Sequence, residues 1–176
     1  MTDSEEKFAA QLAVALSLAC GIPRKVAIYI GDAVLLHDIG KCHIPDSIKN
    51  KPGKLSPSEF EVMKTHTILG ADMLSGLQGD FGKIARNISM YHHEEYGGEG
   101  YWRKNTNDLP RYVQIASICD VYTALISKRI YKQAWPSSKA LHYIQNRAGK
   151  QFCPLLVEIF ISLIDSKCSN NRTVYS

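Results

Sequence analysis

The sequence has none of the features that mark a membrane or secreted protein. Its longest apolar run, between Phe8 and Ala19, is too short to cross a bilayer, and the polar, acidic start is no signal peptide. It also has no block of like charges, and its formal net charge of +4 is mild. Such a charge suits a phosphate-bearing ligand but does not argue for nucleic-acid binding. We therefore expect a cytoplasmic protein that has no membrane segment and binds no nucleic-acid polymer.

Paired cysteines are missing as well. The chain has five cysteines, an odd number, and none of them forms a CxxC pair. This pattern argues against a disulfide framework and suits a reduced compartment. A structural zinc site of the zinc-finger type is disfavoured too. Internal repeats and linkers are absent, so 176 residues with 45% hydrophobic content indicate one globular domain.

Strand signals are weak, whereas apolar residues recur at helical spacing along most of the chain. A first helical face is expected to hold Phe8, Leu12, Leu16 and Ala19. Four further inward rows are expected: Val26, Ile30, Ala33, Val34 and His37; then Phe60, Met63, His66 and Gly70; then Ile84, Ile88 and His92; then Val113, Ala116, Asp120 and Ala124. The sequence therefore predicts an all-α, single helical-bundle domain.

Helix boundaries are predicted from capping residues. Ser56 and Glu59 form a capping-box pattern. Ser137 or Ser138 can cap a helix that ends at Gly149, and a final helix is expected over 155–164. We expect the domain to cover residues 1–165 and a polar C-terminal tail to cover 166–176.

Imidazoles and carboxylates gather at the inward positions or at the ends of these helices. The group holds four of the six histidines and two aspartates: His37, Asp38, His66, His92, His93 and Asp120. Each one, taken alone, is more often a satisfied core residue than a ligand. Together they would be several buried polar groups in need of partners, a need that bound divalent metal would meet.

The expected chemistry follows from such a metal cluster. A carboxylate such as Asp38 can bridge two ions, and a hydroxide held between them is a nucleophile at neutral pH. The same ions neutralise charge on a phosphoryl group during in-line attack. The pattern is therefore typical of proteins that hydrolyse phosphate esters.

Three longer motifs make this prediction more specific. They read HDIGKCHIPDSIKNKPGKLSPSEFEVMKTH, then YHHEEYGGEGYW, then DVYTALISKRIYKQAW. In order and length they resemble the HD-GYP family, HD-superfamily metal-dependent phosphohydrolases of bacterial signalling that degrade cyclic di-GMP. The resemblance covers residues 33–154 closely and implies an all-helical fold.

The resemblance also implies roles for individual residues. His37, Asp38, His66, His92, His93 and Asp120 match the family's metal ligands, with Asp38 as the bridge between two divalent ions, iron or manganese being favoured. Asp38 and Lys41 are the expected catalytic residues, and Lys41 would also contact the substrate phosphate. The other expected substrate-binding residues are Gly100, Tyr101, Trp102, Arg129 and Lys132.

Several positions depart from the family pattern. Trp102 replaces the proline of the GYP motif, which adds a large ring that could stack on a guanine or block the site. Glu5 stands where a first-helix histidine ligand is usual, and a glutamate can still bind a hard cation. The remaining departures are His43 for a glycine, Gln114 for an arginine and Thr123 for an aspartate.

Three functions stay open from the sequence. The first is a metal-dependent phosphodiesterase that opens cyclic di-GMP to pGpG, GMP or both through a metal-bridging hydroxide. The second is a catalytically impaired module that binds a cyclic dinucleotide or a signalling partner, such as a diguanylate cyclase or a response regulator. The third is an HD phosphohydrolase acting on another nucleotide phosphoester.

Overall fold

The computed structural model describes residues 3–104, 109–128 and 133–172, without the side chains of 167–172. In order, its helices are α1 (Asp3–Ala19), α2 (Arg24–Val34), the 3-10 helix η1 (Ile39–His43), α3 (Asp46–Lys49), α4 (Pro57–Lys64), α5 (His66–Met73), α6 (Gly79–Tyr91), α7 (Arg111–Ile126), α8 (Ser137–Asn146) and α9 (Pro154–Arg172). No strand occurs in these ranges, which confirms the all-α prediction.

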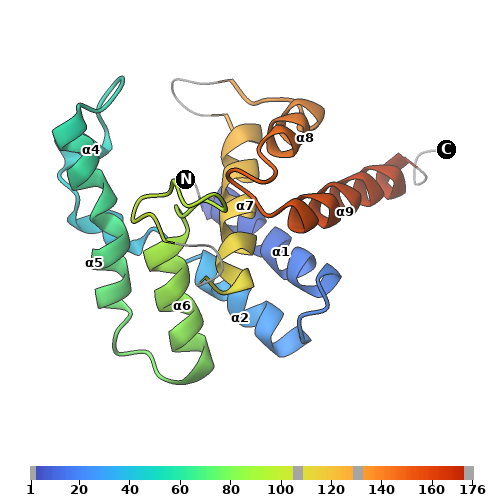
Figure 1. Ribbon diagram of the computed structural model, residues 1–176, viewed down its shortest axis with the longest axis horizontal. Coiled ribbons are helices and arrows are strands. Elements are labelled where there is room, and N and C mark those ends of the chain that lie inside the picture. Colours follow the sequence, from blue (N-terminus) through green and yellow to red (C-terminus); the bar gives the residue numbers. More distant parts are fainter. Residues whose placement is uncertain (1–2, 105–108, 129–132, 173–176) are drawn as a thin grey trace.

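A central group of helices carries the hydrophobic core. α1 packs on α2 and α7, α2 packs on α6, and α5 lies beside α6 and η1 (Figure 1). The largest fully buried side chains include Leu12, Ile30, Ile88, Ile118 and Phe160, from α1, α2, α6, α7 and α9. This packing brings the end of α2, the start of α5, the end of α6 and the middle of α7 to one place.

The buried face of α1 differs from the predicted one. Leu12 and Leu16 are buried as expected, but Phe8 is 41% exposed. Ala9 and Ala13 are buried instead. α2 comes very close to this helix, and a Cβ added at Gly31 would lie 3.1 Å from the carbonyl oxygen of Ala10, which is also buried.

The capping box at Ser56 is confirmed, but the helix that it starts is interrupted at Thr65. Ser56 Oγ accepts from the Glu59 backbone N–H at 3.2 Å, and the Glu59 carboxylate accepts from the Ser56 N–H at 2.6 Å. α4 then ends at Lys64 and α5 begins at His66. The Thr65 hydroxyl donates to the Val62 carbonyl, which bonds the turn locally where the two helices meet.

Three predicted helix boundaries near the C-terminus were wrong. Neither Ser137 nor Ser138 caps α8, because Pro136 is the N-cap residue and the Ser137 hydroxyl is bonded to the Tyr122 hydroxyl at 2.8 Å. α8 ends at Asn146, before Gly149. α9 continues past its predicted end at Ile164 to Arg172, while the domain boundary after residue 165 stays a prediction.

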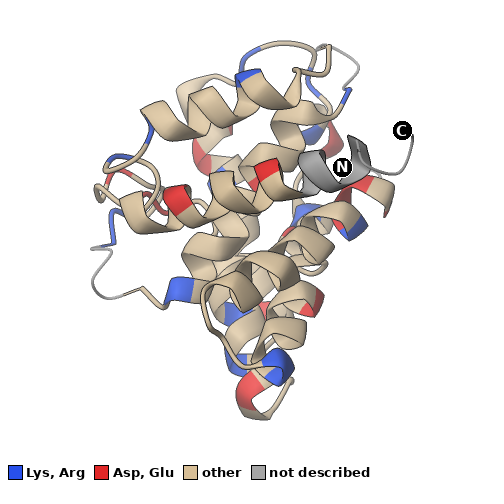
Figure 2. Ribbon diagram, turned by 90° about the vertical axis from the view of Figure 1, so that its right-hand side faces the viewer, with Lys and Arg blue, Asp and Glu red and all other residues tan. Residues whose placement is uncertain are grey.

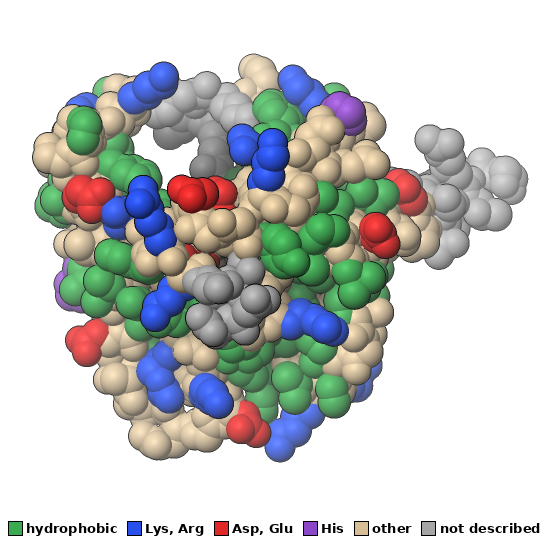
Figure 3. Space-filling model, viewed as in Figure 1, with side chains coloured by type: hydrophobic (Ala, Val, Ile, Leu, Met, Phe, Trp, Pro, Cys, Tyr) green, Lys and Arg blue, Asp and Glu red, His purple; other side chains and the backbone are tan. Residues whose placement is uncertain are grey.

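Charged residues are distributed over many elements rather than gathered in one block (Figure 2). Hydrophobic side chains are also visible on the surface in Figure 3, singly and in small groups. Among the described helices, none combines the length and the apolar character needed to span a bilayer.

Candidate metal centre and adjoining cavities

The predicted metal-binding residues come together from separate elements. His37 and Asp38 follow the end of α2, His66 is the first residue of α5, and Asp120 lies on α7. Asp38, His66, His92 and His93 each offer a ligand atom within 4.8 Å of the others. His37 Nε2 lies 3.3 Å from Asp38 Oδ2 and 3.7 Å from Asp120 Oδ1. We call these six residues the metal centre.

Backbone carbonyls hold three of the four imidazoles. His37 Nδ1 is 2.6 Å from the Val34 carbonyl oxygen, and His66 Nδ1 is 2.7 Å from that of Met63. His92 Nδ1 lies 3.0 Å from the carbonyl oxygens of both Ile88 and Ser89. A carbonyl can only accept, so in each ring Nδ1 carries a proton, and Nε2 is the nitrogen that offers a lone pair to a cation when the ring is neutral. The Nε2 atoms of these rings face Asp38, where a metal ligand is required.

Close backbone packing positions the HD segment. Gly40 lies so near α5 that an added Cβ would meet the His66 carbonyl oxygen at 2.0 Å. Only glycine fits at such a contact. On the other side, the Ser89 hydroxyl donates to the His37 carbonyl at 3.2 Å. The first and second ligand segments are thus fixed against each other and against α6.

The electrostatics of the metal centre are dominated by burial and by Asp38. Burial alone would lower the pKa of His37, but the charges of Asp38 and Asp120 and the Val34 carbonyl outweigh it and raise the pKa to about 9. Burial acts to raise the pKa of Asp38, yet the surrounding imidazoles hold it far below its ordinary value. Burial lowers the pKa of His92, and lowers that of His93 strongly. Asp38 is therefore a carboxylate and His93 a neutral imidazole.

The atoms of this centre fit a divalent cation. His37 Nε2 and Asp38 Oδ1 are buried without a hydrogen-bond partner within the described part of the chain. Buried polar atoms without partners are rare in native proteins. Imidazole nitrogens and carboxylate oxygens are suitable ligands for iron, manganese, zinc and related ions. The donor set and its unsatisfied atoms therefore fit divalent metal binding.

A buried glutamate organises the loop that follows α6, which we call the GYW loop (Glu94–Lys104). Glu94 is 5% exposed, and its carboxylate accepts from the backbone N–H groups of Trp102 at 2.7 Å and Lys104 at 2.8 Å. Gly100 crosses so close to it that an added Cβ would lie 2.4 Å from Glu94 Cα. The sequence analysis missed Glu94. The sequence feature that could have indicated Glu94 was its position directly after the paired histidines.

Trp102 points its polar edge at α5. Its indole Nε1–H donates to the Thr67 hydroxyl at 3.1 Å, and the Lys64 ammonium lies 5.4 Å from its ring centre. Trp102 lines neither of the two cavities that adjoin the metal centre. The ring therefore anchors the GYW loop to α4 and α5 and does not fill the site. Thr67, like Glu94, was not anticipated.

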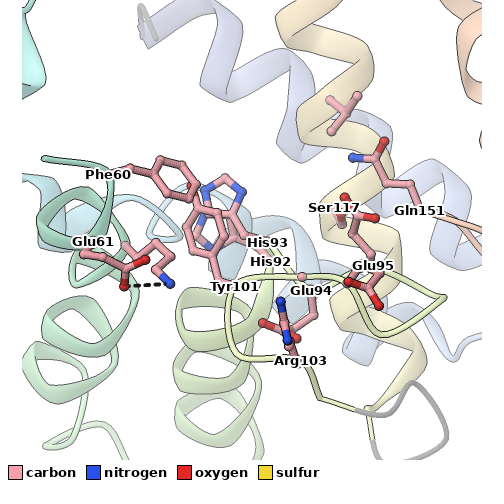
Figure 4. Close-up of a pocket in the computed structure, with 14 residues that line it drawn as sticks. Phe60, Glu61, His92, His93, Glu94, Glu95, Tyr101, Arg103, Ser117 and Gln151 are labelled. Carbon is pink, nitrogen blue, oxygen red and sulfur yellow. Dashed lines mark ion pairs between the residues drawn. The ribbon is translucent and has the colours of Figure 1, made fainter. Parts of the chain in front are cut away.

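Tyr101 connects the GYW loop to the metal centre. Its ring stacks on His93 at a centroid distance of 4.4 Å and meets Phe60 edge-on at 5.5 Å. Burial, together with the charges of Asp38 and Asp120, raises the pKa of Tyr101 to about 12. Tyr101 and Gly100 both line a cavity of about 430 Å³, which we call the acidic cavity (Figure 4).

A second cavity, of about 240 Å³, opens on the other side of His93 and we call it the lysine cavity. Asp38, Lys41 and Asp120 line it. The Lys41 ammonium is bonded to Asp38 and remains 37% exposed. Lys41 therefore lies beside the metal centre and is partly exposed, while its contact with a substrate phosphate stays a prediction.

The remaining predicted residues are placed less directly. Arg129 and Lys132 lie outside the described residues. Glu5 is half-buried on α1 and does not belong to the four-residue ligand group. The Thr123 hydroxyl is buried without a hydrogen-bond partner in the described ranges, and Gln114 lines a separate cavity near Cys20. His43 is exposed at the end of η1.

An all-helical domain that brings four histidines and two aspartates together in this way is typical of metal-dependent phosphohydrolases. Residues 2–156 match the family model of the HD domain. The chain belongs to the HD domain family. The likeness to HD-GYP proteins predicted from the motifs is confirmed by the relatives and the solved structures.

Curated relatives are named as cyclic dinucleotide phosphodiesterases. One is the cyclic di-GMP phosphodiesterase response regulator RpfG of Xanthomonas campestris pv. campestris, 41% identical over 73% of this chain and 34% of its own length. Another is the 3'3'-cGAMP-specific phosphodiesterase 2 of Vibrio cholerae, 37% identical over 80% of this chain and 27% of its own length. The chain thus spans about a third or less of these relatives.

Solved structures share the fold at lower sequence identity. Bd1817, described as an HDG"Y"P protein from Bdellovibrio bacteriovorus, superposes with a TM-score of 0.70 at 22% identity, over 92% of this chain and 51% of that one. The HD domain of the phosphodiesterase PgpH from L. monocytogenes superposes with a TM-score of 0.66 at 15% identity, over 96% and 92% of the two chains. These two likenesses bear on the fold alone.

Proposed function

We propose that this chain is a metal-dependent phosphodiesterase that hydrolyses cyclic di-GMP to pGpG, GMP or both. The observation that carries the proposal is the metal centre, where imidazole and carboxylate atoms converge and two of them are buried without partners. The names of the relatives support the choice of a cyclic dinucleotide. We further propose that the metal centre would hold two ions, iron or manganese, and that Asp38 would be among the residues that bind them.

The residues of the chain have distinct roles in this proposal. Bound divalent ions supply an activated water and neutralise charge on the phosphoryl group. The three backbone-bonded imidazoles hold their Nε2 lone pairs in fixed directions, and Asp38 contributes a carboxylate that is charged at any working pH. Lys41 donates from the lysine cavity to a phosphate oxygen. Arg129 and Lys132 remain predicted substrate contacts.

The decisive experiment joins metal analysis to hydrolysis on one sample. The chain is purified anaerobically, its iron and manganese content is measured, and cyclic di-GMP is added while pGpG and GMP are followed by chromatography. We expect about two ions per chain, as in two-metal hydrolases, and product formation that stops when a chelator is added. Metal without product from any cyclic dinucleotide would reject the phosphodiesterase and favour a binding module.

A mixed cyclic dinucleotide is the second candidate substrate. The observation in its favour is that relatives 37% and 36% identical to this chain are named as 3'3'-cGAMP-specific phosphodiesterases. Parallel assays with cyclic di-GMP and 3'3'-cGAMP separate the two. Trp102 lies against α5 and outside both cavities, so it does not support a catalytically impaired module. Glu5 as a metal ligand, and a diguanylate cyclase or a response regulator as a partner, stay predictions.

A further inference from the structure

We propose that the acidic cavity seats a guanine base of the substrate and selects it against adenine. This inference rests on the proposed function, because it assigns a base-binding role to a cavity beside the same metal centre. His92 and His93 line the cavity, so a ligand in it would be in contact with the centre. Its volume of about 430 Å³ exceeds the space that a purine needs.

Charge disfavours a phosphate group in this cavity. Its lining carries four carboxylates, those of Glu61, Glu94, Glu95 and Glu99, against two cations, which are Arg103 and the Lys64 ammonium paired with Glu61 at 2.8 Å. No ion pair or hydrogen bond engages the carboxylates of Glu95 and Glu99 among the residues that the structure describes. The phosphates would be repelled here and held on the lysine cavity side, where Lys41 stands. The acidic cavity is therefore left for an uncharged part of the substrate.

Aromatic rings at one end of the cavity suit a planar base. Phe60 on α4 is 43% exposed although it lies in contact with Tyr101. Figure 4 shows the Phe60, Tyr101 and His93 side chains grouped on one side of the cavity, opposite Glu95, Ser117 and Gln151. A base that enters from solvent can cover the exposed ring of Phe60, and stacking of this kind does not depend on which base is bound.

The polar groups distinguish guanine from adenine. Guanine presents two adjacent donors, the N1–H and the 2-amino group, which one carboxylate can accept together. Adenine presents an acceptor at N1, which a carboxylate repels. Glu95 and Glu99 supply the carboxylates, and Arg103, whose guanidinium has no partner in the described ranges, supplies donors for the guanine O6 and N7. This set of groups matches both edges of guanine and only part of adenine.

The test compares cyclic di-GMP with cyclic di-AMP on the manganese-loaded chain. We expect the wild type to favour cyclic di-GMP in kcat/KM, and Glu95→Gln/Glu99→Gln to reduce that ratio by about fivefold or more. Phe60→Ala should weaken both substrates by about tenfold and leave the ratio unchanged, because stacking tolerates either base. Phe60→Trp should restore both. Glu158→Gln, at an exposed carboxylate on α9, and Val62→Ala, at an exposed position on α4, are the matched controls.

The outcomes separate this inference from the proposed function. If the manganese-loaded chain hydrolyses neither dinucleotide, its preference is measured instead as the ratio of the two Kd values, by calorimetry. Guanine-selective binding that the double variant abolishes would then support the guanine cavity while rejecting the phosphodiesterase. Hydrolysis of both dinucleotides at equal kcat/KM would keep the phosphodiesterase and overturn the guanine cavity. The guanine cavity would also be overturned if the double variant left the ratio unchanged, or if the chain bound neither dinucleotide.

Discussion

The metal centre and the GYW loop adjoin each other but are held in different ways. In the metal centre, ligand side chains sit at helix ends or on a helix, and backbone carbonyls orient three of the imidazoles. The GYW loop has no regular structure. It is bonded to the side chains of Glu94 inside it and Thr67 outside it, and its backbone N–H groups at 96 and 97 donate to the carbonyls of residues 151 and 150. The rigid elements thus fix the groups proposed for chemistry, and a loop presents the groups proposed for substrate recognition.

The largest effect is expected at the metal centre. Asp38→Ala removes the carboxylate that faces His37, His66 and His92, and leaves their Nε2 atoms without a shared partner. We expect loss of bound metal and a fall in kcat/KM of more than about 100-fold, beyond the cost of losing an outer-shell partner. Metal analysis and hydrolysis on the same preparation check this. Retained metal with normal turnover would mean that Asp38 is not a ligand.

A smaller and different effect is expected inside the GYW loop. Glu94→Gln leaves one carbonyl oxygen where two carboxylate oxygens accept from Trp102 and Lys104, so one backbone N–H loses its acceptor. The loss destabilises the observed conformation of the GYW loop by about 1–3 kcal/mol. We expect kcat/KM to drop about tenfold while the metal content stays unchanged. Loss of metal in this variant would show that the loop and the metal centre are not independently held.

The anchor of the loop on α5 is expected to contribute less. Trp102→Phe keeps the ring near Lys64 but removes the Nε1–H bond to Thr67, which is worth about 1 kcal/mol. A chain of this size should then melt about 2–4 °C lower. Thr67→Val removes the same bond from the other side, together with the bond from Thr67 to the Lys64 carbonyl, so the double variant should lose less stability than the sum of the two single losses. Additive losses would show that the two groups do not interact.

The smallest effect concerns acid stability at the start of α4, away from both regions. The bond from Lys51 and the Ser56 backbone N–H lower the pKa of Glu59 to about 2. Its contribution to folding is therefore present above the ordinary carboxyl pKa of about 4.3 and is lost as the pH falls toward 2. Melting temperatures of wild type and Glu59→Gln should differ at pH 7 and converge in acid. A difference in melting temperature that does not change with pH would show that the low pKa of Glu59 is not its cause.

Local sequence predicted much of the ligand set but not all of its surroundings. His66 and His92 were predicted to face inward from their helical phase, and both are at most 2% exposed. Glu94 could not be predicted as a buried residue, because its acceptor role depends on the loop returning to it eight and ten residues later. Phe8 was predicted to be buried and is exposed, because the buried face of α1 is turned toward Ala9 and Ala13, and which face of a helix is covered depends on its neighbours.

The sequence by itself determined the helical class, the ligand types and the family motifs, because helical period and residue chemistry are local properties. The tertiary structure alone decided that Trp102 would bond to Thr67 and stay out of the site, since this contact joins residues 35 positions apart. It also decided that His66 and His92 meet one carboxylate. The Nδ1 bond of each ring goes to a carbonyl three or four residues earlier and is local, whereas Asp38 faces both Nε2 atoms only because α5 packs against η1 and α6.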